Sequence, residues 1–92
     1  MERQEYNMND QNKIEYIKER YPDSYIMDGF DDAIIGVDCC AGKIVYSFEK
    51  MISVLMERDK MKYDDAVEYI DYNCVRTIPY YGELSPIIVD DL

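Results

Sequence analysis

Apolar residues recur at helical spacing in the second half of the chain. Ser47 can serve as a helix N-cap, and apolar side chains follow it at i, i+3, i+4 and i+7, namely Phe48, Met51, Ile52 and Leu55. After a polar stretch at 57–60, a second apolar stripe consists of Tyr63, Ala66, Val67, Ile70 and Cys74. These stripes predict two helices joined by a tight link, which together form a helical hairpin.

Short runs rich in β-branched residues predict three strands. The runs at 33–37 and 43–46 are separated by a Gly-containing turn at 38–42, so we expect them to pair as a β-hairpin. The segment 77–86 contains two prolines and a glycine and is predicted to be a loop. It leads into a last apolar run at 87–89, which predicts a C-terminal strand.

A narrower apolar stripe predicts one more helix, over residues 10–21, which ends at Pro22. The stripe consists of Ile14, Ile17 and Tyr21. Residues 1–9 are too polar to dock firmly, so we predict a flexible N-terminus at 1–9 and a single α+β domain at 10–92. The predicted fold is a small antiparallel β-sheet, made of the hairpin and the C-terminal strand. It packs against the helical hairpin, with the N-terminal helix in addition.

The charge balance changes the functional picture. The chain has 20 Asp and Glu residues against 10 Lys and Arg residues, and its net charge is -10 without any histidine. Residues 63–92 carry seven acidic side chains and one basic side chain, and so hold -6 of that total. Direct binding to nucleic acid or to an anionic membrane is therefore disfavoured.

The sequence also bears on the compartment. No apolar run approaches the roughly 20 residues that cross a bilayer, and the polar start of the chain has no signal-peptide core. Three cysteines, two of them adjacent, do not make a disulfide framework and fit a reducing compartment. We expect a cytoplasmic protein.

Carboxylates on the second predicted helix of the hairpin form the first candidate site. Asp64, Glu68 and Asp71 recur at i, i+4 and i+7 with Asp65 beside them, so we expect all four on one exposed side. Asp90 and Asp91 would extend this acidic surface. Such a row of carboxylates imitates phosphates, and a Lys- and Arg-lined groove would accept it. The alternative is a solvated helix face whose first-turn acids are favoured by the macrodipole.

Tyrosines form the second candidate site. Tyr80 and Tyr81 precede a flexible glycine, a composition typical of a protein-binding hot spot, although the segment could equally fold onto the core. Other tyrosines fall partly off the apolar stripes, and their exposure would favour a protein interface. They are Tyr6, Tyr16, Tyr25, Tyr69 and Tyr72.

The residues offer little for catalysis. The chain has no histidine for acid-base chemistry, no nucleophile-base pairing and no phosphate-binding glycine motif. We therefore expect no enzyme and no cofactor. Two metal-binding alternatives stay open: a metal shared between two chains through the cysteines, and a Mg²⁺ site. The residues concerned are Cys39, Cys40 and Cys74 for the first, and Asp31, Asp32 and Asp38 for the second.

Several stretches between residues 31 and 89, about two thirds of the chain, carry a resemblance to a known group of proteins. They are Asp32-Ala33-Ile34-Ile35-Gly36, Lys43-Ile44-Val45-Tyr46-Ser47, Met51-Ile52, Ala66 with Tyr69 and Asn73, and Pro86-Ile87-Ile88. In these the chain resembles small, mostly uncharacterised proteins encoded by bacteriophages and prophages. The shared motifs are of the fold type and include no catalytic signature.

The resemblance implies a class of function. Acidic phage proteins of this size without enzyme motifs often inhibit bacterial defences, anti-CRISPR proteins among them, so the expected location is the cytoplasm of a host bacterium. The chain departs from the group where it has Lys60 and Lys62, since relatives tend to have Gly near the first position and Ser or Thr near the second. Loss of such a cap costs about 1 kcal/mol, so we expect a less well fixed link between the helices.

These observations lead to two main hypotheses, beside a third in which the chain is a small metal-dependent enzyme that uses Asp31, Asp32 and Asp38. The first is a phage-encoded acidic protein that binds and inhibits a bacterial nucleic-acid-handling defence protein, such as a CRISPR effector, by occluding its basic groove. The second is a phage structural or assembly module that associates with itself or with a larger phage protein and inhibits nothing.

Overall fold

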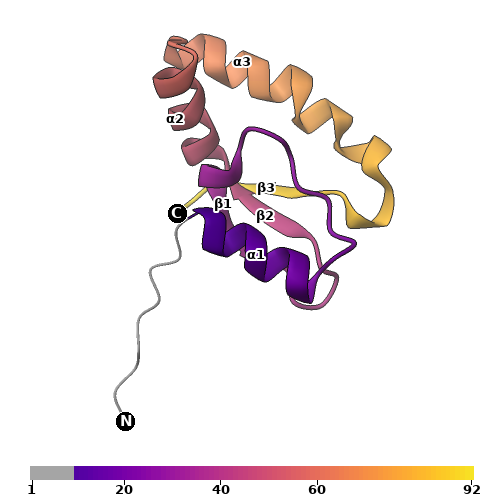
Figure 1. The fold of residues 1–92 in the computed structure, drawn as a ribbon. Coiled ribbons are helices and arrows are strands. Elements are labelled where there is room, and N and C mark those ends of the chain that lie inside the picture. The colour runs from indigo at the N-terminus through magenta and orange to yellow at the C-terminus, as the bar shows by residue number, and fades with distance from the viewer. Residues whose placement is uncertain (1–9) are drawn as a thin grey trace.

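The computed structural model describes residues 10–92 and contains helices and strands in the predicted order (Figure 1). The predicted flexible segment 1–9, with Tyr6, lies outside the described residues. The elements are α1 (Asp10–Arg20), η1 (Asp31–Ala33), β1 (Ile34–Val37), β2 (Ile44–Ser47), α2 (Phe48–Arg58), α3 (Tyr63–Asn73), η2 (Val75–Leu84) and β3 (Ile87–Val89). The α+β class is confirmed, and the two strands of the hairpin lie within one residue of their predicted positions.

The three strands form one sheet in the order β1-β2-β3. β1 and β2 pair antiparallel, as predicted for a hairpin, but β3 pairs parallel to β2, with Val45 opposite Ile87 and Ser47 opposite Val89. The prediction of a fully antiparallel sheet is therefore wrong at β3. The physical reason is the connection: α2, α3 and η2 lead the chain away from the end of β2 and back to its beginning (Figure 1). A crossover of this kind places two strands in the same direction.

The core forms around β2, the central strand. Ile44 and Tyr46 of β2 are fully buried, and the hydroxyl of Tyr46 accepts a hydrogen bond of 2.7 Å from the backbone N–H of Met27. Helices α1, α2 and α3 supply most of the remaining core side chains. These are Ile17 from α1, Met51, Ile52 and Leu55 from α2, and Ala66 and Ile70 from α3, followed by Cys74. The predicted stripes of α2 and α3 are thus confirmed as their core-facing sides, except at Tyr63, which is 48 % exposed.

The start of α2 is fixed as its sequence predicts. Ser47 is the N-cap, and its hydroxyl accepts a hydrogen bond of 3.2 Å from the backbone N–H of Lys50. Such a bond satisfies one of the backbone donors that a helix N-terminus leaves without a partner. Because Ser47 is also the last residue of β2, the chain passes from strand to helix without a loop.

The link between α2 and α3 has a lysine at each of the two positions where a cap residue would be favoured. Lys60 adopts a φ of 58°, in the left-handed region that favours glycine. Lys62 stands at the N-cap of α3 with the extended backbone of a cap, but its side chain makes no capping hydrogen bond. The backbone N–H of Met61 donates to the carbonyl of Leu55 across 3.3 Å and closes the link.

The segment predicted as a loop at 77–86 is mostly helical. Its residues 77–84 belong to η2, a pair of 3-10 helices separated by a kink at Gly82, which has a φ of 79°. The hydroxyl of Thr77 donates to the carbonyls of Asn73 and Cys74, at 3.1 Å and 2.8 Å, and so satisfies acceptors left at the end of α3. Coiling therefore continues past α3, and Pro79 is compatible with it because the fixed φ of proline suits a 3-10 turn.

Candidate functional site

Helix α3 presents the predicted carboxylates to solvent. The helix turns Ala66 and Ile70 into the core, so residues spaced away from that stripe must face outward. All four acids are exposed, and we call them the acidic ridge: Asp64, Asp65, Glu68 and Asp71. Within residues 10–92, three of the four make no salt bridge, and the fourth, Asp71, pairs with Arg76 at 3.6 Å. Among the described residues, therefore, only Asp71 of the ridge has its charge paired.

Two tyrosines interrupt the acidic ridge on the same helix. Tyr69 is 38 % exposed and Tyr72 is 63 % exposed. Between them the surface is hollowed by a volume of about 470 Å³, which Asp65 and Glu68 also line. The outward side of α3 thus combines carboxylates with rigid aromatic rings. Both kinds of group can attract a cationic protein surface, whereas solvation of a helix face does not need exposed rings.

Arg76 ties the end of the acidic ridge to a tyrosine. Its guanidinium lies 4.9 Å from the centre of the Tyr72 ring while it also pairs with Asp71. Arg76 is not among the predicted site residues. A signal was present, because Arg76 follows Tyr72 by four residues and would share its side if helical coiling continued past α3. The predicted loop at 77–86 concealed that continuation.

Tyr80 and Tyr81 have different environments. Tyr80 is 86 % exposed, whereas the ring of Tyr81 stacks on that of Tyr25 with 4.2 Å between their centres. The Tyr81 and Thr77 hydroxyls also share a hydrogen bond of 3.2 Å, and hydrogen bonding with Tyr81 raises the pKa of Tyr25. Tyr81 therefore packs η2 against the segment before η1. Of the predicted pair, only Tyr80 is largely exposed to solvent.

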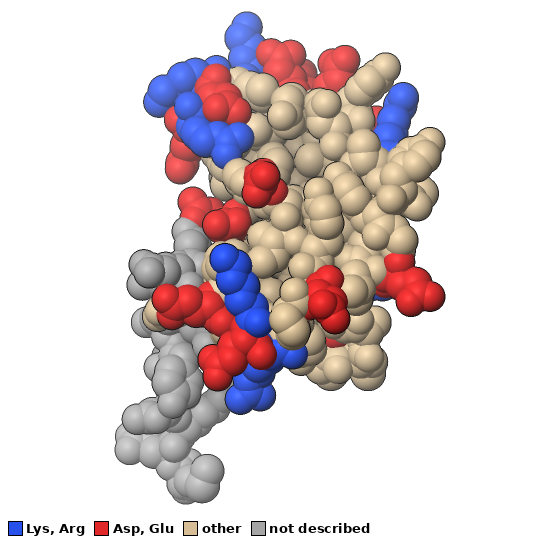
Figure 2. All heavy atoms as spheres, turned by 45° about the vertical axis from the view of Figure 1, so that its right-hand side comes forward, with Lys and Arg blue, Asp and Glu red and all other residues tan. Residues whose placement is uncertain are grey.

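One face of the molecule has a large uncharged area. In Figure 2, side chains other than Lys, Arg, Asp and Glu cover most of the middle and right of the molecule, and charged side chains lie mainly at its top and along its left and lower parts. Exposed apolar and aromatic residues of α3 and η2 include Tyr72, Val75 and Tyr80. An uncharged area with charged side chains beside it is a common feature of protein-protein interfaces.

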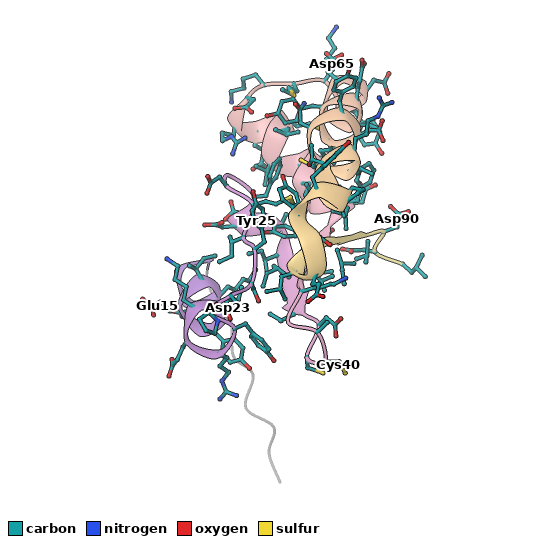
Figure 3. All side chains as sticks on the ribbon, turned by 90° about the vertical axis from the view of Figure 1, so that its right-hand side faces the viewer. Glu15, Asp23, Tyr25, Cys40, Asp65 and Asp90 are labelled. Carbon is teal, nitrogen blue, oxygen red and sulfur yellow. The ribbon has the colours of Figure 1, made fainter. Side chains whose placement is uncertain are left out.

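Asp90 and Asp91 lie apart from the start of α3. The carboxylate of Asp91 accepts a hydrogen bond of 2.9 Å from Ser47 at the beginning of α2, whereas Asp64 and Asp65 lie beyond its other end. An 11-residue helix spans about 16 Å, and Figure 3 shows Asp65 and Asp90 well separated. The structure thus does not bring the two C-terminal acids to the first turn of the acidic ridge, and Asp91 has a structural contact instead.

The residues of the metal alternatives are dispersed. Asp31 and Asp32 form the first turn of η1, while Asp38 lies past the other end of β1, where its carboxylate accepts hydrogen bonds from the backbone N–H groups of Cys40 and Ala41. Within residues 10–92, no three His, Cys, Asp or Glu side chains gather in a metal-binding group.

The cysteines lie where core and turn residues are expected. Cys39 and Cys40 are exposed in the hairpin turn (Figure 3, Cys40), and Cys74 is buried behind α3, where burial raises the pKa of its thiol. The described structure offers neither the Mg²⁺ triad nor a set of three cysteines within one chain.

A second hollow, of about 430 Å³, lies between the turn before β1 and α2 and is lined by Asp31, Asp32 and Glu57 together with Arg58. Arg58 is already engaged: it donates to the carbonyl of Gly29 at 2.7 Å and pairs with Asp59 at 3.1 Å. Its role here is to hold the turn at Gly29 against α2. This contact joins residues 29 positions apart, and no local sequence pattern indicates it.

Comparison with protein-family models, with curated proteins and with solved structures finds no match to this chain. Among the helices within residues 10–92, none has both the length and the apolar character to cross a membrane. The acidic ridge and the tyrosines beside it are therefore the features of the described residues that bear on function.

Proposed function

We propose that this protein acts by binding a partner protein that has a basic groove for nucleic acid. The observation that carries the proposal is the exposure of Asp64, Asp65 and Glu68 on one side of α3, without a salt bridge among the described residues. Their negative charge is available to a cationic surface, and charge complementarity of this kind speeds encounter and selects partners. The exposed rings of Tyr72 and Tyr80 supply apolar anchors near the charge.

The mechanism that we propose is occlusion. The acidic ridge takes the place of phosphates in the groove of the partner, and the bound protein excludes the nucleic acid by bulk and by charge. The net charge of -10 disfavours nucleic acid itself as the ligand. In this proposal the protein is a phage-encoded inhibitor of a bacterial defence protein of the CRISPR effector kind. It acts in the host cytoplasm and performs no catalysis.

Co-purification from a host bacterium at low and at raised salt tests the proposal. The tagged protein should retain a nucleic-acid-binding protein at low salt and lose it at raised salt, because exposed charges are screened over about 8 Å at physiological ionic strength. The double variant Asp64→Lys/Glu68→Lys should lose the same partner. Purified complex should also fail to bind the nucleic acid that the free partner binds.

The chain offers a matched control on α1. Glu15 and Glu19 are exposed, are spaced i, i+4 like Asp64 and Glu68, and belong to a different helix (Figure 3, Glu15 and Asp65). Glu15→Lys/Glu19→Lys therefore changes the net charge equally without touching the acidic ridge. Equal loss of the partner from both double variants, or retention at high salt, would contradict binding through α3.

The exposure of Tyr72 and Tyr80 favours a second candidate function, that of a phage assembly module that associates with itself or with a larger phage protein. In that case acidity serves solubility, and Asp64→Lys/Glu68→Lys should leave association intact. Sedimentation velocity of the wild type and of Tyr72→Ser/Tyr80→Ser tests whether the protein associates with itself through these tyrosines. Oligomers that only the tyrosine substitutions dissociate would favour assembly over inhibition.

A further inference from the structure

The hollow on α3 has a composition that selects one kind of occupant. Its volume is about 470 Å³, and its walls combine the rings of Tyr69 and Tyr72 with the carboxylates of Asp65 and Glu68. Met61 and Asn73 complete the lining. Aromatic faces attract cations through their quadrupole, and carboxylates pair with cations directly, so both kinds of wall favour the same charge.

The protein already uses this combination within itself. Arg76 lies over the ring of Tyr72, at 4.9 Å from its centre, and at the same time pairs with Asp71 at 3.6 Å. Two further arginines of the described chain lie over aromatic rings, Arg20 over Tyr16 at 5.0 Å and Arg58 over Phe30 at 5.8 Å. One tyrosine of the hollow therefore already holds a guanidinium with help from a neighbouring carboxylate.

We propose that the hollow on α3 binds an arginine side chain of the partner protein, with the guanidinium against Tyr69 and Tyr72 and paired with Asp65 or Glu68. The inference rests on the proposed function, because it specifies the contact that the basic partner makes. Arginine fits better than lysine because its planar, weakly hydrated guanidinium stacks on rings and pairs with carboxylates in a two-pronged geometry. Lysine offers the same charge without that plane.

An NMR titration with blocked oligoarginine and oligolysine peptides of equal length tests this inference. The chemical-shift changes should concentrate at Tyr69 and Tyr72. Oligoarginine should bind about two- to five-fold more tightly than oligolysine, the range expected for an exposed cation-ring contact. Tyr72→Leu, which keeps every charge, should abolish that preference. Asp65→Asn/Glu68→Gln should weaken the binding of both peptides. Glu15→Gln/Glu19→Gln makes the same change in net charge, but it should leave the preference for arginine and the position of the chemical-shift changes as they are.

A gain of binding gives a second test. Arg76→Ala removes the internal competitor for Tyr72 and Asp71, so oligoarginine should bind more tightly. Arg20→Ala is the matched control, because it removes an arginine from over a tyrosine on α1. An equal increase in both variants would attribute the gain to net charge and overturn the specific role of the hollow.

The failure of this inference and the failure of the proposed function are distinguishable. Equal affinity for the two peptides, or shifts spread over α1 as much as α3, would overturn the arginine site. Occlusion of a basic groove would still stand, because the charge of the acidic ridge attracts a basic groove without a specific arginine in the hollow. An arginine preference centred on Tyr69 and Tyr72, combined with co-purification of no nucleic-acid-binding protein, would keep the site and remove the proposed function.

Discussion

The hydroxyl of Ser47 donates a hydrogen bond of 2.9 Å to the carboxylate of Asp91, 44 residues away in the sequence. The same hydroxyl accepts from the backbone N–H of Lys50, so one buried side chain caps α2 and holds the end of the chain. Asp91 places a negative charge at the N-terminus of α2, where the helix dipole stabilises it. An acid that the sequence analysis assigned to partner binding thus has a structural contact.

Ser47→Ala should destabilise the protein by about 1 to 2 kcal/mol, because it removes the cap of α2 and the partner of Asp91 together. Urea unfolding followed by circular dichroism measures the change. Asp91→Asn, which keeps a hydrogen-bond acceptor but removes the charge, should cost less than Ser47→Ala. A larger effect from Asp91→Asn would mean that charge at α2 outweighs the cap.

Lys60→Gly should stabilise the protein by about 0.5 to 1 kcal/mol. The left-handed φ of 58° costs a residue with a Cβ about 1 to 2 kcal/mol, and the greater unfolded-state freedom of glycine offsets part of the gain. Lys60→Ala removes the same charge but keeps the Cβ, so it should give no such gain. Equal midpoints for the two variants in urea would refute the strain at Lys60.

Lys62→Ser should stabilise α3 by about 1 kcal/mol. Position 62 has extended backbone angles suited to an N-cap, yet the lysine side chain makes no capping hydrogen bond. A serine hydroxyl there can accept from a free N–H of the first turn. Lys62→Ala separates this effect from the loss of a positive charge, and thermal unfolding of the two variants should place the serine variant higher.

Tyr46→Phe should destabilise the protein by about 1 to 3 kcal/mol at neutral pH, because the buried N–H of Met27 loses its acceptor. The burial of Tyr46 also predicts that the stability of the protein depends on pH. Burial raises the pKa of Tyr46, so above pH about 10 the folded state keeps a proton that the unfolded state has lost. Stability contributed by this proton is complete below that pH and decreases as the pH rises above it.

Measuring the free energy of unfolding of the wild type and of Tyr46→Phe between neutral and alkaline pH checks the direction of this pH dependence. The wild type should lose stability faster than Tyr46→Phe above pH about 10, by up to about 1.4 kcal/mol per pH unit. The other tyrosines are common to both proteins and cancel in the comparison. A constant difference across the range would show that Tyr46 ionises equally in the folded and unfolded states.

The local parts of the fold could be predicted because their causes are local. The apolar spacing of α2 and α3 selects their buried faces, Ser47 caps α2 through a neighbour three residues on, and the four acids of α3 are exposed because the opposite stripe is buried. The absence of a cap glycine and of a capping side chain between α2 and α3 is likewise evident from Lys60 and Lys62 in the sequence. These features depend on residues within one or two helical turns of each other.

The direction of β3, the course of η2 and the place of Asp91 were decided by the tertiary structure. β3 runs parallel to β2 because the helices return the chain to the start of that strand, a matter of three-dimensional path and not of the residues at 87–89. Tyr81 is not largely exposed, because its ring stacks on that of Tyr25, 56 residues earlier in the sequence. Local patterns predict elements and faces, whereas contacts between distant segments depend on the energy of packing the whole chain.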